Sequence, residues 1–204
     1  MSAIAVDHLL IATAHLDAAA AAAEGLGLPV AAGGRHSGWG TANRIVPLGD
    51  AYLELVAVVD AAEAAASGFG SWVAAAPPGP MGWAVHPADL DATAGRLGLG
   101  VVPGARAAPD GRTLRWRTAG VEHAALEPTL PFFIAWEAGT PFPGAGATGI
   151  EVERIDLHGD AGRLAAWLDG LGPPVSVTPG PPAVERIVLR AAAGTLTIDA
   201  ATFG

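Results

Sequence analysis

The sequence predicts an α+β fold made from a repeated unit of strand, helix and further strands. The first copy occupies about residues 1–60, and much of its pattern recurs in residues 81–138 and again in residues 150–204. Each copy opens with a strand-like apolar segment, continues with a helical stretch and ends in short β-type runs. Because one such unit cannot close its own core, the copies are expected to pack against each other.

The first copy begins with a strand and a helix. Ile4, Val6, Leu10 and Ala12 alternate with other residues, which indicates a strand. Residues 16–26 are rich in alanine, the residue with the highest helix propensity, and are therefore predicted to form a helix.

The rest of the first copy is predicted to be a loop and two strands. The segment GGRHSGWG, residues 33–40, reads as a Gly-rich loop. Residues 44–48 and 52–58 follow as strands, joined through the turn-forming pair Gly49-Asp50.

The middle of the chain contains a connector and the second copy. Residues 60–80 are expected to connect the two copies, with a short helix around Trp72 and a final breaker run, PPGP. The second copy has a helix that starts near Leu90 and a loop over residues 103–112 with the turn signal Pro-Asp-Gly at 109–111. The runs TLRWRT and PFFIAW then form its strands.

The third copy is shorter. Residues 140–149 are rich in Pro and Gly and are predicted to be a linker, followed by a C-terminal βαββ unit over residues 150–204. An incomplete unit leaves a strand edge unpaired. We therefore expect this unit to pack on the rest of the chain or to pair with another chain, and a homodimer is the predicted assembly.

Composition excludes several classes of function. The 204 residues carry a formal net charge of -9, whereas proteins that bind phosphate backbones usually show a basic stripe. The chain has no cysteine and no run of roughly 20 apolar residues that could cross a bilayer. Its first residues lack the basic region of a signal peptide. These features predict a cytoplasmic protein that binds neither nucleic acid nor membrane.

Nucleotide and hydrolase motifs are also missing from the sequence. There is no phosphate-binding Gly-Lys-Ser/Thr motif and no Gly fingerprint for a dinucleotide, so a nucleotide cofactor is not expected. No Gly-x-Ser-x-Gly elbow is present, which argues against a serine hydrolase.

Three segments of the chain resemble a known family. GGRHSGWGTANRIVPLGDAYLELVAV, together with LRWR and LPFFIAW, resembles the glyoxalase-like domain of the vicinal oxygen chelate (glyoxalase/bleomycin resistance/dioxygenase) superfamily. The resemblance implies paired βαβββ modules within residues 1–139, whose curled sheets enclose a cavity, followed by the C-terminal half-module. In metal-using relatives, the first and last strands of each module supply His and Glu ligands to a divalent cation that polarises vicinal oxygens of a substrate.

The resemblance places the metal-ligand positions of the first module at His8 and Glu54. Both residue types bind cations such as zinc, manganese, nickel or iron. An offset of 74 residues between the copies puts their counterparts at Gly82 and at about Ala135, which cannot coordinate a metal through their side chains. A catalytic zinc usually has three protein ligands. No spacing selects a replacement among the remaining candidates, which are His86, His123, Glu127 and Glu137.

Glu54 is also the candidate catalytic residue. It interrupts an apolar strand and shares one face with Tyr52 and Val56. On a cavity-facing side it must be paired, hydrated or metal-bound, because an isolated buried charge is costly. On a solvent-facing side it is an ordinary surface acid, and His8 has the corresponding interpretation as a hydrogen-bonded histidine at a strand end.

The Gly-rich segment supplies candidate substrate contacts. Arg35, His36 and Trp39 lie among its glycines, with Asn43 shortly after. Arginine can clamp a carboxylate or phosphate, and a tryptophan can cover an apolar ligand body. The alternative is a mobile hairpin whose glycines only serve its turns.

Aromatic residues of the second copy supply a candidate wall. Alternation places Phe132, Ile134 and Trp136 on one face of a strand and Phe133 on the other. Ligand pockets are mostly apolar with a few polar anchors, so Phe132 and Trp136 are predicted ligand contacts.

These observations favour a small-molecule-binding glyoxalase-like protein. One interpretation is a divalent-metal-dependent lyase, isomerase or dioxygenase that acts on vicinal oxygens. The alternatives are a non-catalytic binder that sequesters a small apolar compound, as resistance members of the superfamily do, or a structural module with a vestigial site.

Overall fold

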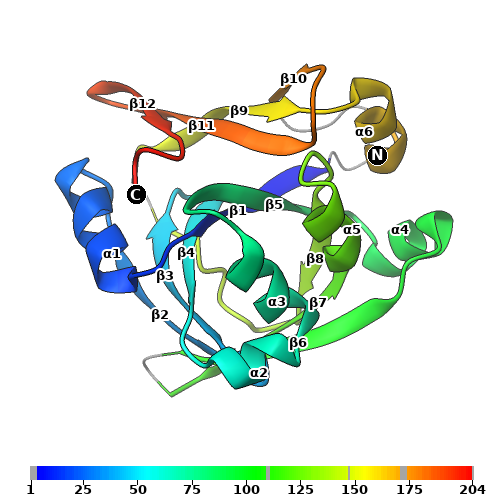
Figure 1. Ribbon diagram of the computed structural model, residues 1–204, viewed down its shortest axis with the longest axis horizontal. Coiled ribbons are helices and arrows are strands. Elements are labelled where there is room, and N and C mark those ends of the chain that lie inside the picture. Colours follow the sequence, from blue (N-terminus) through cyan, green and yellow to red (C-terminus); the bar gives the residue numbers. More distant parts are fainter. Residues whose placement is uncertain (1–3, 109–110, 147, 171–173, 204) are drawn as a thin grey trace.

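The structure of the protein is a computed structural model that describes residues 4–108, 111–146, 148–170 and 174–203. In these residues the chain forms a closed eight-stranded barrel and a separate four-stranded sheet (Figure 1). The predicted α+β class and curled sheet are confirmed.

The barrel strands follow an order that brings distant segments together. β1 and β5 pair antiparallel, while β4 and β8 pair parallel with β1 and β5 respectively. A short seam between β2 and β6, where His36 pairs with Arg106, closes the ring. Around the barrel the strands are β1 (Ala5–Ala12), β4 (Tyr52–Val58), β3 (Thr41–Pro47), β2 (Ala31–His36), β6 (Val101–Ala107), β7 (Thr113–Ala119), β8 (Phe132–Trp136) and β5 (Gly79–His86).

Short helices connect and cover the barrel strands. In the part of the chain described they are α1 (Leu16–Gly25), α2 (Ala61–Ala65), α3 (Gly68–Ala75), α4 (Leu90–Leu97) and α5 (Val121–Leu126). Three of these helices are capped by a side chain that accepts a hydrogen bond from a backbone N–H group. The caps are Asp60 for α2, Ser67 for α3 and Asp89 for α4. Two helices thus replace the single helix expected around Trp72, and α5 was not predicted.

The Gly-rich segment that was predicted to be a loop is partly a strand. Residues 33–36 lie in β2, and the turn is confined to residues 37–40. A Cβ atom on Gly33 would lie 2.1 Å from Asn43 Oδ1. The glycine therefore marks a close approach between two strands rather than a loop.

Part of the predicted loop of the second copy is also a strand. Residues 103–107 belong to β6, which pairs along its length with β7 and, through Arg106, with His36 of β2. Residues 109 and 110 of the predicted turn lie outside the described residues. As part of a strand, Arg106 lies on the barrel wall, where it is buried.

The C-terminal unit has one strand more than the predicted βαββ pattern. β10 pairs parallel with β9, and the sheet order is β10-β9-β11-β12. The additional strand is only four residues long, too short for its alternation to be distinguished in the sequence. The elements are β9 (Glu151–His158), α6 (Ala161–Leu168), β10 (Val175–Thr178), β11 (Ala183–Ala191) and β12 (Gly194–Ile198).

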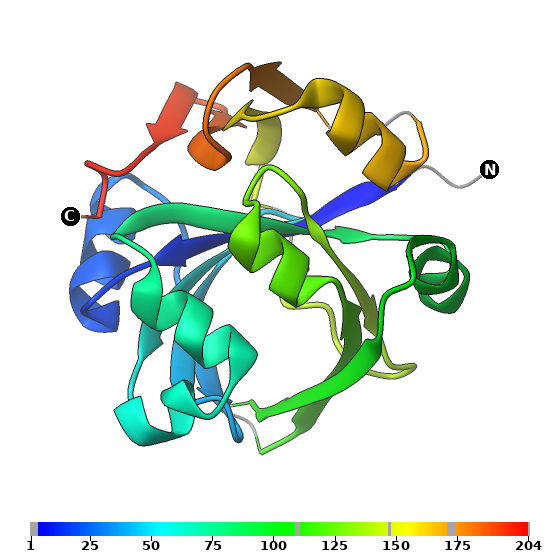
Figure 2. The same cartoon turned by 45° about the vertical axis from the view of Figure 1, so that its right-hand side comes forward.

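This C-terminal unit packs on the barrel, as predicted. Figures 1 and 2 show its sheet on the β5 side, away from α2. The Trp167 ring lies 5.8 Å from that of Phe133, and its Nε1 donates a hydrogen bond of 2.8 Å to Pro131 O. Arg96 donates to the carbonyl of Ala166 across the same contact. The predicted homodimer stays a prediction.

The alternation of the barrel strands separates two apolar clusters. Leu53 and Phe133 point outward into the core shared with the C-terminal sheet. Val56 and Phe132 point inward, where Trp72 of α3 packs with them. Among the residues described, no helix has the length and apolarity to cross a membrane.

We predict that Trp167→Ala lowers the free energy of unfolding by about 3–5 kcal/mol, since it removes a large buried ring and leaves a cavity. Trp167→Phe keeps the ring contact, loses the bond to Pro131 and is expected to cost about 1 kcal/mol. Urea unfolding of the full chain measures both. Leu126→Ala is the matched control, because Leu126 is 85% exposed. Equal, small effects for all three variants would contradict this account of the packing.

Candidate active site

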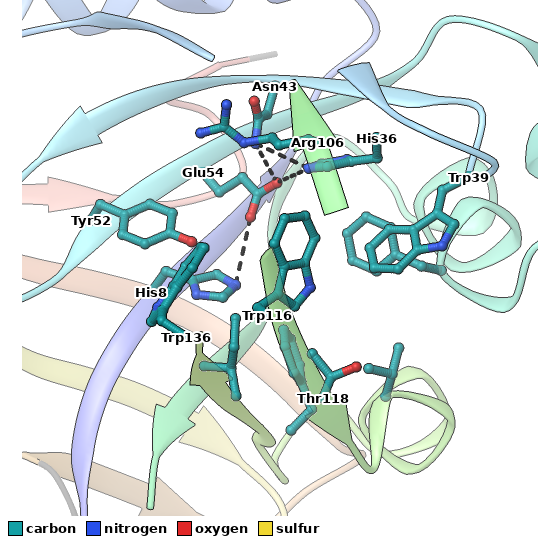
Figure 3. Close-up of a pocket in the computed structure, with 14 residues that line it drawn as sticks. His8, His36, Trp39, Asn43, Tyr52, Glu54, Arg106, Trp116, Thr118 and Trp136 are labelled. Carbon is teal, nitrogen blue, oxygen red and sulfur yellow. Dashed lines mark hydrogen bonds and ion pairs between the residues drawn. The ribbon is translucent and has the colours of Figure 1, made fainter. Parts of the chain in front are cut away.

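The inward faces of the barrel strands enclose a cavity of about 30 Å³ (Figure 3). A buried water needs roughly 10–15 Å³, so there is room for about two. Both copies of the repeat line this space. The lining residues are His8, His36, Trp39, Asn43, Tyr52, Glu54, Phe69, Arg106, Trp116, Thr118, Val121, Phe132, Ile134 and Trp136.

Glu54 lies at the centre of the polar half of this cavity. It is 5% exposed, and Asn43 Nδ2 donates a hydrogen bond of 2.9 Å to its Oε1. His36 Nε2 lies 3.4 Å from the same oxygen, while His8 Nε2 is 3.6 Å from Oε2. A contact of 3.6 Å is too long for a hydrogen bond. Within the described residues Oε2 therefore accepts no hydrogen bond.

Strand register explains how these side chains meet. β1 pairs with β4 so that His8 lies opposite Tyr52, and their rings stack at 4.7 Å. Alternation then directs Glu54 to the cavity, two residues after Tyr52. The expectation that His8 and Glu54 share one cavity is thus met, and so is the inward face predicted for Phe132 and Trp136.

Asp7 holds the ring of His8, although it was not predicted as a site residue. Its Oδ1 lies 2.7 Å from His8 Nδ1, and its Oδ2 accepts a bond of 3.0 Å from Trp136 Nε1. Adjacent strand residues normally point to opposite faces. An irregularity in the pairing of β1 with β5 between Val6 and His8 breaks that alternation. No sequence pattern signals this irregularity.

His36 and Tyr52 are held in their neutral forms. Burial lowers the pKa of His36, and the charges of Arg106 and His8 lower it further against the opposing effect of Glu54. Burial raises the pKa of Tyr52 well above 10, and the carboxylates of Asp7 and Glu54 add to this. The cavity thus offers a neutral imidazole and a phenol that keeps its proton.

Asn43 fixes the direction of its own amide. Its Oδ1 accepts a hydrogen bond of 2.8 Å from the Gly34 N–H, so Nδ2 faces Glu54. The same Nδ2 lies 3.2 Å from Nε2 of His36, whose Nδ1 is 2.8 Å from Thr41 Oγ1. These contacts hold the predicted residues His36 and Asn43 against the carboxylate.

Arg106 is the main site residue that the sequence reasoning missed. It is 5% exposed, lines the cavity and lies opposite His36 across the β2–β6 seam. Its Nη1 is buried without a hydrogen-bond partner. The assignment of residues 103–112 to a loop concealed the inward position that a strand gives to this side chain.

The predicted contact Arg35 is not brought to the cavity. Its side chain is 52% exposed and pairs with Asp60 and Glu63 on the outside of the barrel. Trp39 remains a wall residue of the cavity. The Gly-rich segment therefore supplies His36 and Trp39 to the site, whereas its arginine forms ion pairs on the surface.

Among the described residues of the second copy, no His, Asp or Glu lines the cavity as a possible metal ligand. A Cβ atom on Gly82 would lie 2.5 Å from Trp72 Cη2, so an indole ring fills the space of a longer side chain. Ala135 packs against the outer cluster, whereas Phe132 and Ile134 of the same strand line the cavity, so the predicted counterpart of Glu54 does not face the site.

The available donors therefore do not fit a three-ligand metal centre. Among the described residues, no group of three or more His, Asp or Glu is arranged to hold a metal ion. The four candidates for the missing ligands do not line the cavity, namely His86, His123, Glu127 and Glu137.

Comparisons with known proteins agree with this architecture. The family model described as a glyoxalase-like domain matches residues 6–172. No match is found among curated protein sequences. The crystal structure of a hypothetical protein from Staphylococcus aureus is similar with a TM-score of 0.75 and 15% identity, over 93% of this chain and 92% of that chain.

Two enzymes of known structure are more distantly similar. Methylmalonyl-CoA epimerase from Mycobacterium tuberculosis has a TM-score of 0.45 and 22% identity, over 65% of this chain and 86% of that chain. The Streptomyces coelicolor methylmalonyl-CoA epimerase in complex with 2-nitronate-propionyl-CoA has a TM-score of 0.47 and 20% identity, over 66% and 97%. Likeness at this level does not carry an activity over to this chain.

The lowered pKa of His36 predicts how stability depends on pH. Because the unfolded state has the ordinary value of about 6.5, it binds more protons than the folded state below that pH. The stability contributed by a neutral His36 is therefore present above about pH 6.5 and is lost as pH falls. Urea unfolding of the native protein should show a steeper loss of stability between pH 7 and about pH 5 than His36→Asn. The exposed His15→Asn is the control, and identical pH profiles for all three proteins would contradict the assignment.

Proposed function

This chain belongs to the glyoxalase-like domain family, and from that premise we propose that it binds a small organic molecule inside the barrel and moves a proton on it, as an isomerase or lyase does. The observation that carries the proposal is the Glu54 carboxylate, which is buried in the cavity while its Oε2 accepts no hydrogen bond from the described residues.

We assign this site to the paired βαβββ modules of residues 1–139. Residues 140–149 then serve as the linker, and residues 150–204 as a supporting module.

Glu54 has the position of a general base. Its free Oε2 would take a proton from a carbon next to a carbonyl group. The C–H electron pair then forms a C=C bond, and the carbonyl oxygen takes the negative charge. Protonation of the same carbon on its opposite face gives epimerisation, and protonation of the neighbouring carbon of an enediolate gives isomerisation. Loss of a leaving group from the next carbon gives a lyase reaction. A cavity with room for about two waters limits competing protonation by solvent.

Neighbouring groups support this step. Tyr52 keeps its phenolic proton because its pKa is raised, so it can donate a hydrogen bond to the developing oxyanion. Asn43 holds Glu54 by its oriented amide. Asp7 holds His8 beside the unbonded oxygen. Asn43 and His8 thus position the carboxylate, whereas Tyr52 acts on the substrate oxygen.

The opposite wall selects an apolar ligand body. Phe132, Ile134, Trp116 and Trp136 line the cavity across from the polar cluster, and Trp39 lies on its wall. Aromatic and aliphatic walls with few polar anchors are typical of small-molecule sites. We therefore expect a ligand with an aryl or alkyl group beside its reactive carbonyl.

Divalent-metal chemistry at His8 and Glu54 is a second candidate. It is favoured by the two imidazole nitrogens of His8 and His36, which face the two oxygens of Glu54 at 3.6 and 3.4 Å. Against it, Asn43 already donates to Oε1, and among the described residues of the second copy no His, Asp or Glu lines the cavity. With His8 and Glu54 as its only protein ligands, a metal would be weakly bound and exchangeable.

We predict that the native protein catalyses deuterium exchange at the methylene groups of phenylacetone and phenylpyruvate in D₂O. Glu54→Gln keeps the shape of the side chain but cannot accept the proton, so it should lower the exchange rate by about 10²–10⁴-fold. Proton NMR follows the loss of the methylene signal.

The matched control for this experiment is Glu63→Gln, which changes a carboxylate on the outside of the barrel. Binding of either compound without exchange by the native protein would favour the non-catalytic binder. An unchanged exchange rate in Glu54→Gln would remove Glu54 as the base.

We predict that treatment with a chelator leaves this exchange rate unchanged, because the donors around Glu54 do not fit a firmly held metal. Metal analysis and exchange assays are run before and after chelation, and again after addition of zinc, manganese, nickel or iron(II). Activity that is lost on chelation, restored by one metal and absent from the double variant His8→Ala, Glu54→Ala would establish the metal centre instead.

A further inference from the structure

We propose that Arg106 is an anion-binding anchor and that the ligand is a carboxylate whose apolar body extends into a second pocket beside the cavity. This inference rests on the proposed function and adds the chemical class of the ligand. It begins from a buried cation that the protein itself leaves without a full set of partners.

The burial of Arg106 is costly without an anion. A guanidinium that loses water needs hydrogen bonds and an opposite charge to compensate. Nη1 of Arg106 is buried and makes no hydrogen bond, and no ion pair joins this arginine to a carboxylate among the described residues. A bound carboxylate would supply both, since the fork of a guanidinium matches its two oxygens.

The position of Arg106 is built into the barrel seam. β6 meets β2 where Arg106 lies opposite His36. A Cβ atom on Gly34 would lie 3.2 Å from Nη1 of Arg106 and 2.2 Å from the carbonyl oxygen of Ala107. The guanidinium therefore packs over bare backbone, and a longer residue at position 34 would displace it.

The charge of Arg106 acts on the rest of the cavity. It lowers the pKa of His36 and opposes the increase in the pKa of Tyr52. Its positive field therefore reaches both walls of the polar half. An anion bound to Arg106 would lie near the Glu54 carboxylate, and the two negative charges would repel each other. The reactive carbon of the ligand must therefore lie between the ligand's own carboxylate and Glu54.

A second pocket provides the space that the cavity lacks. The inner cavity of about 30 Å³ has room for the oxygens of a carboxylate, whereas the neighbouring pocket has about 450 Å³. The outer pocket contains exposed apolar side chains, Val102 at 54% and Leu126 at 85%. Four residues line both spaces and form the wall between them, namely Trp39, Phe69, Thr118 and Val121.

The two pockets together define one ligand chemistry. A planar carboxylate suits the small inner space and the arginine fork better than a tetrahedral phosphate, which has more oxygens to place. An aryl or alkyl body suits the outer pocket. Rotation of Trp39 or Phe69 would join the two spaces when such a ligand enters. The expected ligand is therefore an apolar monocarboxylate.

Isothermal titration calorimetry with 3-phenylpropanoate and its uncharged amide tests this inference. The native protein should bind the acid at least about tenfold more tightly than the amide. Arg106→Met and Arg106→Lys should each weaken binding of the acid by about tenfold or more while leaving the amide unaffected, because lysine keeps the charge but not the fork. Arg117→Met is the control, since Arg117 pairs with Asp91 on the surface.

Thermal unfolding separates binding from a structural role. Without ligand, Arg106→Met should unfold at the same temperature as the native protein or higher, because it removes an incompletely compensated charge. Inorganic phosphate should compete poorly with the acid. Equal affinity of the native protein for acid and amide, full affinity in Arg106→Lys, or an Arg106→Met protein that is strongly destabilised would each overturn the proposal.

The two hypotheses fail in different ways. If Arg106 variants lose binding of the acid but the native protein exchanges no deuterium, the anion anchor stands and proton transfer at Glu54 fails. If exchange at phenylpyruvate depends on Glu54 but proceeds at the native rate in both Arg106 variants, proton transfer stands and the anchor fails.

Discussion

A buried carboxylate needs hydrogen bonds or an opposite charge to offset the loss of water, and the polar side chains inside this barrel surround one such carboxylate, that of Glu54. Asn43 donates to one of its oxygens, and the amide of Asn43 is fixed in turn by Gly34. His8 faces the other oxygen, at a distance that leaves it unbonded. The polar network therefore orients the carboxylate without saturating it, as expected for a group that has to accept a proton.

Closure of the barrel makes this network possible. The seam between β2 and β6 joins the two copies of the repeat and sets His36 beside Arg106. Bare backbone at Gly34 permits the close approach of the two strands. The outward faces are stabilised independently, because Leu53 and Phe133 pack with the C-terminal sheet. The outer core and the candidate site thus use opposite faces of the same strands, so inward residues can change without loss of the outer core.

Period-two alternation could predict much of the site but not all of it. It grouped Glu54 with Tyr52 and Trp136 with Phe132, and in the structure these shared faces line the cavity. Alternation did not predict β2 or the start of β6 as strands, because both segments contain glycine or proline, which are typical of loops. Arg106 was missed for that reason. Asp7 depends on an irregularity in strand pairing that has no sequence signature.

The two halves of the cavity show how one repeated fold acquires an asymmetric chemistry. In the first copy β1 and β4 supply His8 and Glu54, whereas in the second copy β8 supplies Phe132 and Ile134. Trp72 occupies the space beside Gly82, so a coordinating side chain could return there only if the indole moved. Such an arrangement favours a ligand with one polar and one apolar end over a symmetric chelate. In this chain the first copy supplies the buried carboxylate and both imidazoles of the cavity, and the second supplies Arg106 and most of the aromatic wall.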